Sequence, residues 1–229
     1  MFDLHGYGPS LLEGALLTLQ VALTSLTLAV ALGMLGALAK LSESRLARAA
    51  AAIYTTTIRG VPELVMMLLI FFGGQMLVNN LAVWFGYEDY IDVNPFTAGV
   101  ITIGFIYGAY MTETFRGAIL AVPPGQLEAG YAFAMTRAQV FRRILLPQMM
   151  RHALPGLGNN WLVLLKTTAL VSVIGLDDMV RKASLAAGAT RLPFTFHLTV
   201  ALGFLAFTTV SVLLLRWAEQ RYSIGVRQD

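Results

Sequence analysis

The chain has 229 residues, of which 57% are hydrophobic and 13% are charged, with a net charge of +3. Such a composition is typical of an integral membrane protein and excludes an ordinary soluble domain. The absence of cysteine excludes disulfides and thiolate metal sites, and three scattered histidines form no metal-ligand cluster. The length suits a single membrane domain over residues 1–229, without room for an attached catalytic domain.

The first half of the chain contains two predicted spans. Residues 1–10 have neither a basic segment nor a small-residue cleavage site, so no cleaved signal peptide is predicted. The first span covers about 11–39, and a basic stretch follows it. The second covers about 49–78, and its Gly60 and Pro62 loosen the helix where two charges, Arg59 and Glu63, lie in apolar sequence. Such irregular backbone persists at membrane depth only where it faces protein or a water-filled cavity.

An acidic loop and a third span come next. The loop, about 79–94, contains Glu88, Asp89 and Asp92 and no basic residue. The third span covers about 96–120, and its polar and charged residues include Tyr107, Tyr110, Glu113 and Arg116. Glu113 and Arg116 are three residues apart, so a helix places them on one face.

A polar, basic, helix-forming segment separates the third and fourth spans, over about 126–147. Thr136 and Gln139 have the spacing of a capping box, which predicts a helix that begins at Arg137 and ends at Pro147. The segment is therefore predicted to hold two short helices with a corner at residues 135–136. Its arginines at 137, 142 and 143 stay available to water or lipid phosphate.

The fourth and fifth spans complete the chain. The fourth covers about 153–176, is expected to be interrupted by Pro155 and the residues up to Asn160, and carries Lys166. A loop over 177–193 leads to the last span, about 194–217. Five crossings place the two termini on opposite sides of the membrane.

The basic residues fix the orientation. With the amino terminus outside, the cytosolic side holds Lys40, Arg45, Arg48, Arg137, Arg142, Arg143, Arg151, Arg216, Arg221 and Arg227. The outer side then holds three basic residues, at 181, 182 and 191, together with the acidic loop. The positive-inside rule favours this topology, with a periplasmic amino terminus and a cytoplasmic carboxyl terminus.

Several motifs resemble one family. They are Thr57–Pro62, Gly108–Gly117, Val122–Gln126, the cytosolic segment from Glu128 with its closing Ile-x-Leu-Pro, and Ala153–Asn159 with Lys166. Together they resemble the polar amino acid permeases among ATP-binding cassette (ABC) importers, over residues 10–225. Within that family the chain is similar to the Q-type membrane subunits of the histidine and lysine-arginine-ornithine branch. The resemblance implies an all-α integral membrane protein with five transmembrane helices and the type I importer, MetI-like, permease fold.

In that family the cytosolic segment is a coupling element that docks in a groove on the ATPase. The positions that match in register are Glu128, Ala129, Ile144, Leu146 and Pro147. Two positions depart from the pattern: Gly130 replaces an alanine and stays small, and Ala134 replaces a glycine. Because Ala134 is poorly suited to a positive φ, the Thr136 cap is expected to make the corner instead. A membrane-surface loop without docking is the alternative.

The resemblance also implies partners. These are a homologous M-type permease subunit, or else a second copy, two ATPase subunits and a periplasmic amino-acid-binding protein, in the bacterial inner membrane. The chain has no Gly-rich phosphate loop, so it is expected to have no ATPase site and to bind no cofactor, while ATP and magnesium bind to the ATPase subunits. No nucleic acid partner is expected. Transport would then proceed by alternating access.

Buried charges give the candidate site. Arg59, Glu113, Arg116 and Lys166 are interpreted as a structural charge network, because each charge at bilayer depth needs a partner or a cavity. Glu63 either binds the guanidinium or ammonium group of a basic cargo or forms a salt bridge to Lys166 or the partner subunit. We therefore expect arginine, ornithine, lysine or histidine as cargo.

The remaining candidates for substrate contact are Asn159, Tyr107 and Glu113. The Asn159 amide could hold the backbone groups of an amino acid or satisfy carbonyls freed by Pro155. Tyr107 could instead be a packing residue with a hydrogen-bonded hydroxyl. Two other function classes remain: an intramembrane enzyme, for which no paired-aspartate, Ser/His or His-Glu-x-x-His arrangement is present, and a subunit of a channel.

Overall fold

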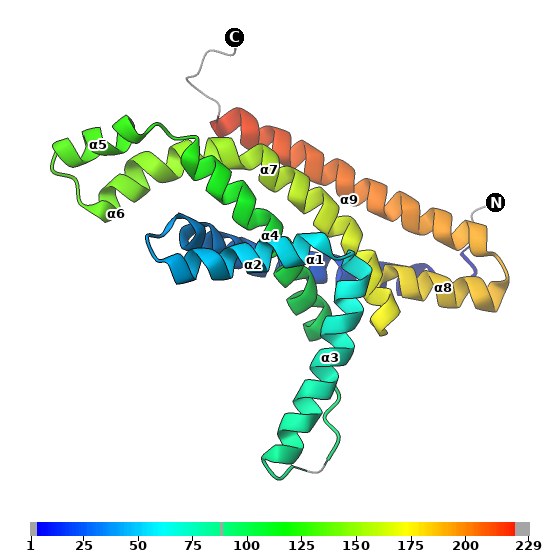
Figure 1. Cartoon of the computed structure of the whole chain (residues 1–229). Coiled ribbons are helices and arrows are strands. Elements are labelled where there is room, and N and C mark those ends of the chain that lie inside the picture. The colour runs from blue at the N-terminus through cyan, green and yellow to red at the C-terminus, as the bar shows by residue number, and fades with distance from the viewer. Residues whose placement is uncertain (1–3, 88, 223–229) are drawn as a thin grey trace.

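The structure is a computed structural model that describes residues 4–87 and 89–222, so Glu88 and Arg227 lie outside the described residues. Over these ranges the regular elements are all helices, which confirms the predicted all-α class. In chain order they are α1 (Gly8–Leu41), α2 (Arg45–Gly60), α3 (Glu63–Trp84), α4 (Pro95–Leu120), α5 (Pro124–Ala132), α6 (Arg137–Val140), the π-helix η1 (Phe141–Leu145), α7 (Leu146–Thr167), the 3₁₀-helix η2 (Thr168–Ile174), α8 (Met179–Thr190) and α9 (Pro193–Tyr222) (Figure 1).

The core is built around the close approach of α1 and α4. Small residues line the buried face of α1 at intervals of three or four, including Ala22, Ala29, Gly33 and Ala37. A Cβ at Gly33 would lie 2.5 Å from the Cβ of Met111 and 3.0 Å from its carbonyl carbon. Small residues at a helix contact allow the two backbones to come this close, which maximises dispersion contacts in a membrane protein.

Four described helical segments are long and apolar enough to cross a membrane: Gly8–Leu41, Glu63–Trp84, Arg137–Ile174 and Pro193–Arg221. They correspond to the predicted first, second, fourth and fifth spans. The predicted third span is α4, which does not meet the same criterion. It is instead the central helix of the core, with buried residues along most of its length.

The predicted second span is two helices rather than one loosened helix. α2 ends at Gly60, α3 begins at Glu63, and Val61 and Pro62 between them have extended ψ values of 137° and 136°. Proline disfavours helical backbone in the preceding residue, which explains the break. α3 projects away from the other helices (Figure 1) and continues to Trp84, into the predicted loop.

Pro147 does not end the second helix of the cytosolic segment, and Pro155 does not break the helix of the fourth span, contrary to both predictions. Before Pro147 the chain forms the π-helix η1, in which the Leu146 N–H donates to the Phe141 carbonyl. Pro147 then occupies the first turn of α7, where its missing N–H is tolerated. Pro155 lies inside α7 without interrupting it. The irregular backbone comes later, in η2, which ends at Gly175 with φ +95°.

The predicted outer loop over 177–193 contains the helix α8. Asp178 caps it by accepting a 2.9 Å hydrogen bond from the Arg181 N–H. α8 packs on α1, where the Met179 N–H donates to Thr18 Oγ1 at 3.3 Å. A Cβ at Gly14 would lie 2.9 Å from Met179 Cα, so the two backbones are in direct contact.

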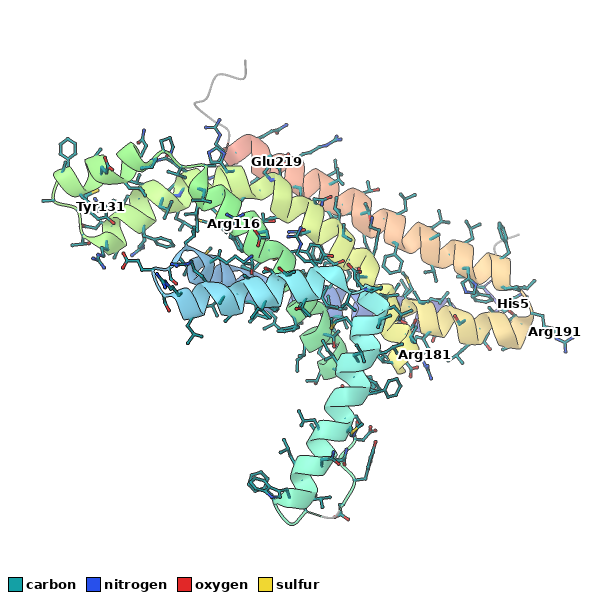
Figure 2. The ribbon with its side chains drawn as sticks, viewed as in Figure 1. His5, Arg116, Tyr131, Arg181, Arg191 and Glu219 are labelled. Atoms are coloured by element: carbon teal, nitrogen blue, oxygen red, sulfur yellow. The ribbon has the colours of Figure 1, made fainter. Side chains whose placement is uncertain are left out.

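The start of α1, α8 and the start of α9 share one end of the molecule. The rings of Tyr7 and Phe196 have centroids 5.8 Å apart, and Lys182 donates to Glu13 at 2.8 Å. The α5–α6 hairpin lies at the other end, together with the carboxyl end of α9 (Figure 1). Figure 2 shows the same separation, with Tyr131 at the hairpin and Arg191 at the opposite end.

The cap of α8 predicts a pH-dependent stability. Asp178 is fully buried, one of its carboxylate oxygens has no hydrogen-bond partner among the described residues, and burial raises its pKa from 3.8 to about 6. A raised folded-state pKa means that its contribution to stability is fully present below pH 3.8 and is lost as pH rises through 6.

Asp178→Asn keeps an oxygen to cap α8 but cannot ionise. We expect the variant to match the wild type near pH 4 and to exceed its stability at pH 7, by up to about 3 kcal/mol. Thermal unfolding of both proteins in detergent from about pH 4 to 8 measures the difference. A constant difference across this range would contradict the assignment.

Candidate functional site

Glu63 lies where α3, α4 and α7 meet. The backbone is irregular on two sides of this junction, because α3 begins after the break at Pro62 and α7 gives way to the 3₁₀-helix η2. Glu63 is the first residue of α3. Tyr107 of α4 donates to Glu63 Oε1 at 3.0 Å, and Thr167 at the end of α7 donates to Oε2 at 2.8 Å. The hydroxyl oxygens of Tyr107 and Thr167 are 2.7 Å apart. Both carboxylate oxygens are thus held, and the helix N-terminus favours the negative charge.

The polar centre of Glu63, Tyr107 and Thr167 contains two predicted site residues and one that the sequence did not reveal. Tyr107 is buried and Glu63 is half-buried, which places a carboxylate inside apolar surroundings. Thr167 carried no signal of its own, because threonine is common in membrane helices as a donor to the preceding turn. Lys166, one of the alternative partners considered for Glu63, is exposed and forms no ion pair with any described residue.

A second charged cluster lies toward the carboxyl ends of α1 and α4. Glu113 accepts from Lys40 and, at 2.9 Å, from Arg116 on its own helix. Arg116 lies on α4, toward the hairpin end (Figure 2). Lys40 was not predicted as a member. Arg59 is exposed and lies instead over the ring of Tyr110, 5.3 Å from its centroid. Of the four residues proposed as a charge network, Glu113 and Arg116 form an ion pair, whereas Arg59 and Lys166 form none with the described residues.

The two asparagines of α7 have different surroundings. Asn160 donates to Thr114 Oγ1 of α4 at 3.0 Å. Asn159 is exposed and makes no side-chain hydrogen bond with the described residues, so it does not satisfy the carbonyl that Pro155 leaves without a donor in α7.

Substitution of these asparagines tests whether their different contacts contribute differently to stability. Asn160→Ala removes an interhelical hydrogen bond, so we expect a loss of about 0.6 to 1 kcal/mol in stability. Asn159→Ala is expected to leave stability unchanged. Thermal unfolding in detergent checks both, and equal losses for the two variants would contradict the difference in contacts.

The predicted coupling segment forms a helical hairpin of α5, α6 and η1. Its capping box is present: Gln139 N–H donates to Thr136 Oγ1 at 3.3 Å, and Thr136 N–H donates to Gln139 Oε1 at 2.8 Å. The corner prediction was incomplete, because Ala134 adopts φ +55° despite its Cβ. The corner is therefore made by two features, the Thr136 cap and a left-handed Ala134, whose conformation is strained because alanine has a Cβ.

Gly130 allows the two helices of the hairpin to pack closely. It is buried, and a Cβ there would lie 2.6 Å from Ile144 Cδ1 and 3.1 Å from Val140 Cγ2. The glycine thus leaves room for the larger side chains of the second helix, which explains why the departure from alanine is accommodated.

The outer surface of the hairpin is open. Glu128, Ala129 and Pro147 are exposed, and Ile144 and Leu146 are partly buried. Two aromatic side chains accompany them, with Phe133 81% and Tyr131 50% exposed. Aromatic side chains are enriched at protein interaction sites, so the exposed Tyr131 and Phe133 favour such a site here.

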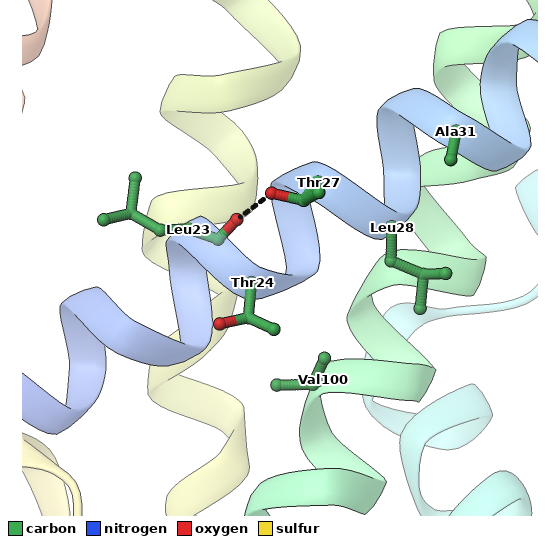
Figure 3. Close-up of a pocket in the computed structure, with 6 residues that line it drawn as sticks. All are labelled: Leu23, Thr24, Thr27, Leu28, Ala31 and Val100. Atoms are coloured by element: carbon green, nitrogen blue, oxygen red, sulfur yellow. Dashed lines mark hydrogen bonds between the residues drawn. The ribbon is translucent and has the colours of Figure 1, made fainter.

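A groove on the surface between α1 and α4 has a different chemistry. Its volume is about 600 Å³, and its walls are Leu23, Thr24, Thr27, Leu28, Ala31 and Val100 (Figure 3). Both threonine hydroxyls donate to carbonyls of their own helix, Thr24 to Gln20 at 2.7 Å and Thr27 to Leu23 at 2.9 Å. The groove thus offers apolar contacts and does not suit a charged amino acid.

Comparison with known proteins shows the family to which the chain belongs. Residues 29–224 match the family described as binding-protein-dependent transport system inner membrane component. The chain is 53% identical over 225 residues to the histidine/lysine/arginine/ornithine transport system permease protein HisQ of Escherichia coli (strain K12), covering 98% of each chain. It is 42% identical over 227 residues to the octopine transport system permease protein OccQ of Rhizobium radiobacter, covering 99% of this chain and 96% of the relative.

Solved structures agree in fold. The chain is similar to a crystal structure of an amino acid ABC transporter with histidines. The TM-score is 0.77, the sequence identity is 34%, and the match covers 94% of this chain and 95% of that chain. An inward-facing form of the methionine ABC transporter MetNI, at 16% identity and a TM-score of 0.61, shares the fold. The type I permease fold predicted from the sequence is confirmed. The chain belongs to the family of binding-protein-dependent transport system inner membrane components.

Proposed function

We propose that this chain is the permease subunit of an ATP-driven importer that moves a basic amino acid from periplasm to cytoplasm. The observation that carries the choice of cargo is the Glu63 carboxylate, held between Tyr107 and Thr167 at the junction of α3, α4 and α7. No cation of the described residues neutralises it, so a guanidinium or ammonium group passing this point would gain a charge-assisted hydrogen bond.

The names of the relatives support the same cargo class. HisQ is named for histidine, lysine, arginine and ornithine transport, and a permease of Haemophilus influenzae, 40% identical over 209 residues, is named for arginine. Basic side chains are common to these substrates. Among them we propose arginine as the first to test.

The hairpin is proposed to dock on an ATPase subunit through Glu128, Ala129 and the exposed aromatic residues. With a periplasmic amino terminus, which the distribution of basic residues favours, five crossings by α1, α2 with α3, α4, α7 and α9 would put the hairpin and the carboxyl terminus in the cytosol. The placement of α8 and the start of α1 at the end opposite the hairpin supports this orientation.

In the proposed complex this chain pairs with an M-type permease subunit or a second copy, above two ATPase subunits and below a periplasmic binding protein. ATP and magnesium bind to the ATPase subunits. Their closure moves the docked hairpin, and because α6, η1 and α7 form one continuous helix, that motion reaches Thr167 beside Glu63.

Reconstitution tests the proposal. The chain is assembled in vesicles with its membrane and ATPase subunits, and ATP hydrolysis is measured with receptor alone and with arginine-loaded receptor. We expect hydrolysis to rise with loaded receptor and arginine to accumulate inside. Arginine flux that is independent of ATP would indicate a channel and contradict the proposal.

A further inference from the structure

One face of the second hairpin helix forms a small cationic pocket. Its volume is about 320 Å³, and it is lined by Ala138, Gln139, Arg142 and Arg143. All four side chains are exposed. Val140 and Ile144 face Gly130 in the contact between the two helices of the hairpin, and neither of them lines the pocket.

The two guanidinium groups have no partner among the described residues. Neither Arg142 nor Arg143 forms a hydrogen bond or an ion pair there. Two other arginines do form hydrogen bonds: Arg48 donates to the carbonyls of Ser42 and Glu43, and Arg181 donates to Asp177. Two adjacent unpaired guanidinium groups beside an amide donor form a site suited to a phosphate group.

The π-helix contributes to this arrangement. Arg142 and Arg143 both lie in η1, where the backbone makes i→i+5 hydrogen bonds. Such wide turns are rare and occur frequently at functional sites. Here the wide turn also leads past Pro147 into α7, so the pocket is built into the entrance of a membrane helix.

The geometry points to an anionic phospholipid headgroup of the inner leaflet as the occupant of the Arg142–Arg143 pocket. η1 runs without interruption into α7, and Arg151 is the last basic residue before its apolar part. Basic residues at the cytosolic start of a membrane helix attract anionic lipids. The docking residues proposed above, Glu128, Ala129 and the exposed aromatic residues, lie on α5 and at its carboxyl end, whereas the pocket lies on α6 and η1. The inference rests on the inward orientation of the hairpin and is independent of the cargo.

The test compares lipid retention between variants of the full chain. Wild type, Arg142→Gln/Arg143→Gln and the charge-matched control Arg45→Gln/Arg216→Gln are placed in nanodiscs of phosphatidylglycerol and phosphatidylcholine. Native mass spectrometry then measures which lipids remain bound. We expect preferential retention of phosphatidylglycerol, reduced on the order of tenfold in the pocket variant and little changed in the control.

A second variant, with lysine at both positions, distinguishes loss of the positive charge from misfolding. Arg142→Lys/Arg143→Lys keeps the charge, so it is expected to retain part of the preference. Equal retention in the pocket variant and the control would overturn the inference. So would loss of ATPase binding with unchanged lipid retention, which would assign the pocket to the ATPase, or displacement of lipid by millimolar inorganic phosphate, which would assign it to a free anion.

Discussion

Arginine uptake by vesicles that contain Glu63→Leu transporter should fall by about a hundredfold, because the cargo loses a charge-assisted hydrogen bond in a low-dielectric site. Leucine fills a similar volume, so the three-helix junction should still pack. The hydroxyls of Tyr107 and Thr167 can then hydrogen-bond to one another, as they already lie 2.7 Å apart. Uptake of labelled arginine at a fixed ATP concentration measures the effect.

Two controls identify the cause. Tyr107→Phe removes one donor to Glu63 but keeps the charge, so it should reduce uptake far less. Glu113→Gln removes a carboxylate whose partners, Lys40 and Arg116, are already within the protein. Its effect should appear in stability more than in cargo selectivity. Full arginine uptake by Glu63→Leu, with the complex assembled, would refute the role of this carboxylate.

Gly33→Val should destabilise the fold more than any of the other substitutions proposed above. The new side chain would enter the space of Met111, because even a Cβ at this position would lie 2.5 Å from the Met111 Cβ and 3.0 Å from its backbone. Overpacking costs about 1 to 3 kcal/mol where side chains can yield, and backbone yields less readily. We expect a loss of at least about 3 kcal/mol, seen as a lower midpoint of thermal unfolding in detergent.

Gly117→Ala is the matched control. Gly117 is a helical glycine of α4, and a Cβ added there would meet no atom within 4 Å. Alanine is favoured over glycine in a helix by about 1 kcal/mol, so this variant should be as stable as the wild type or more so. Similar losses in both variants would show that α1 and α4 do not pack backbone against backbone at Gly33.

Local features of the sequence predicted local structure well. The Thr136 and Gln139 capping box and the start of the helix at Arg137 depend on residues three apart, and both are present. The continuation through Pro147 could not be predicted in the same way, because the π-helix that permits it has no strong sequence signature. α8 was missed because it is short and rich in small residues, although Asp178 at its start is a typical N-cap.

The site depended on contacts distant in sequence. Glu63 and Tyr107 were both singled out, but they are 44 residues apart and their hydrogen bond required the tertiary fold. Thr167 is 104 residues from Glu63, and Lys40 is 73 residues from Glu113. Charge alone could not distinguish Lys40 from Arg59 as the partner of Glu113, because the sequence does not show that the packing of α2 places Arg59 over the ring of Tyr110.

The most direct test of the account is a crosslink at the hairpin corner. The chain has no cysteine, so Phe133→Cys introduces a unique thiol at a side-chain position that is 81% exposed. During ATP-driven uptake this thiol should crosslink to an ATPase subunit and resist a membrane-impermeant reagent added from the periplasmic side. Labelling from the periplasmic side, or continued uptake with no crosslink to the ATPase, would contradict it.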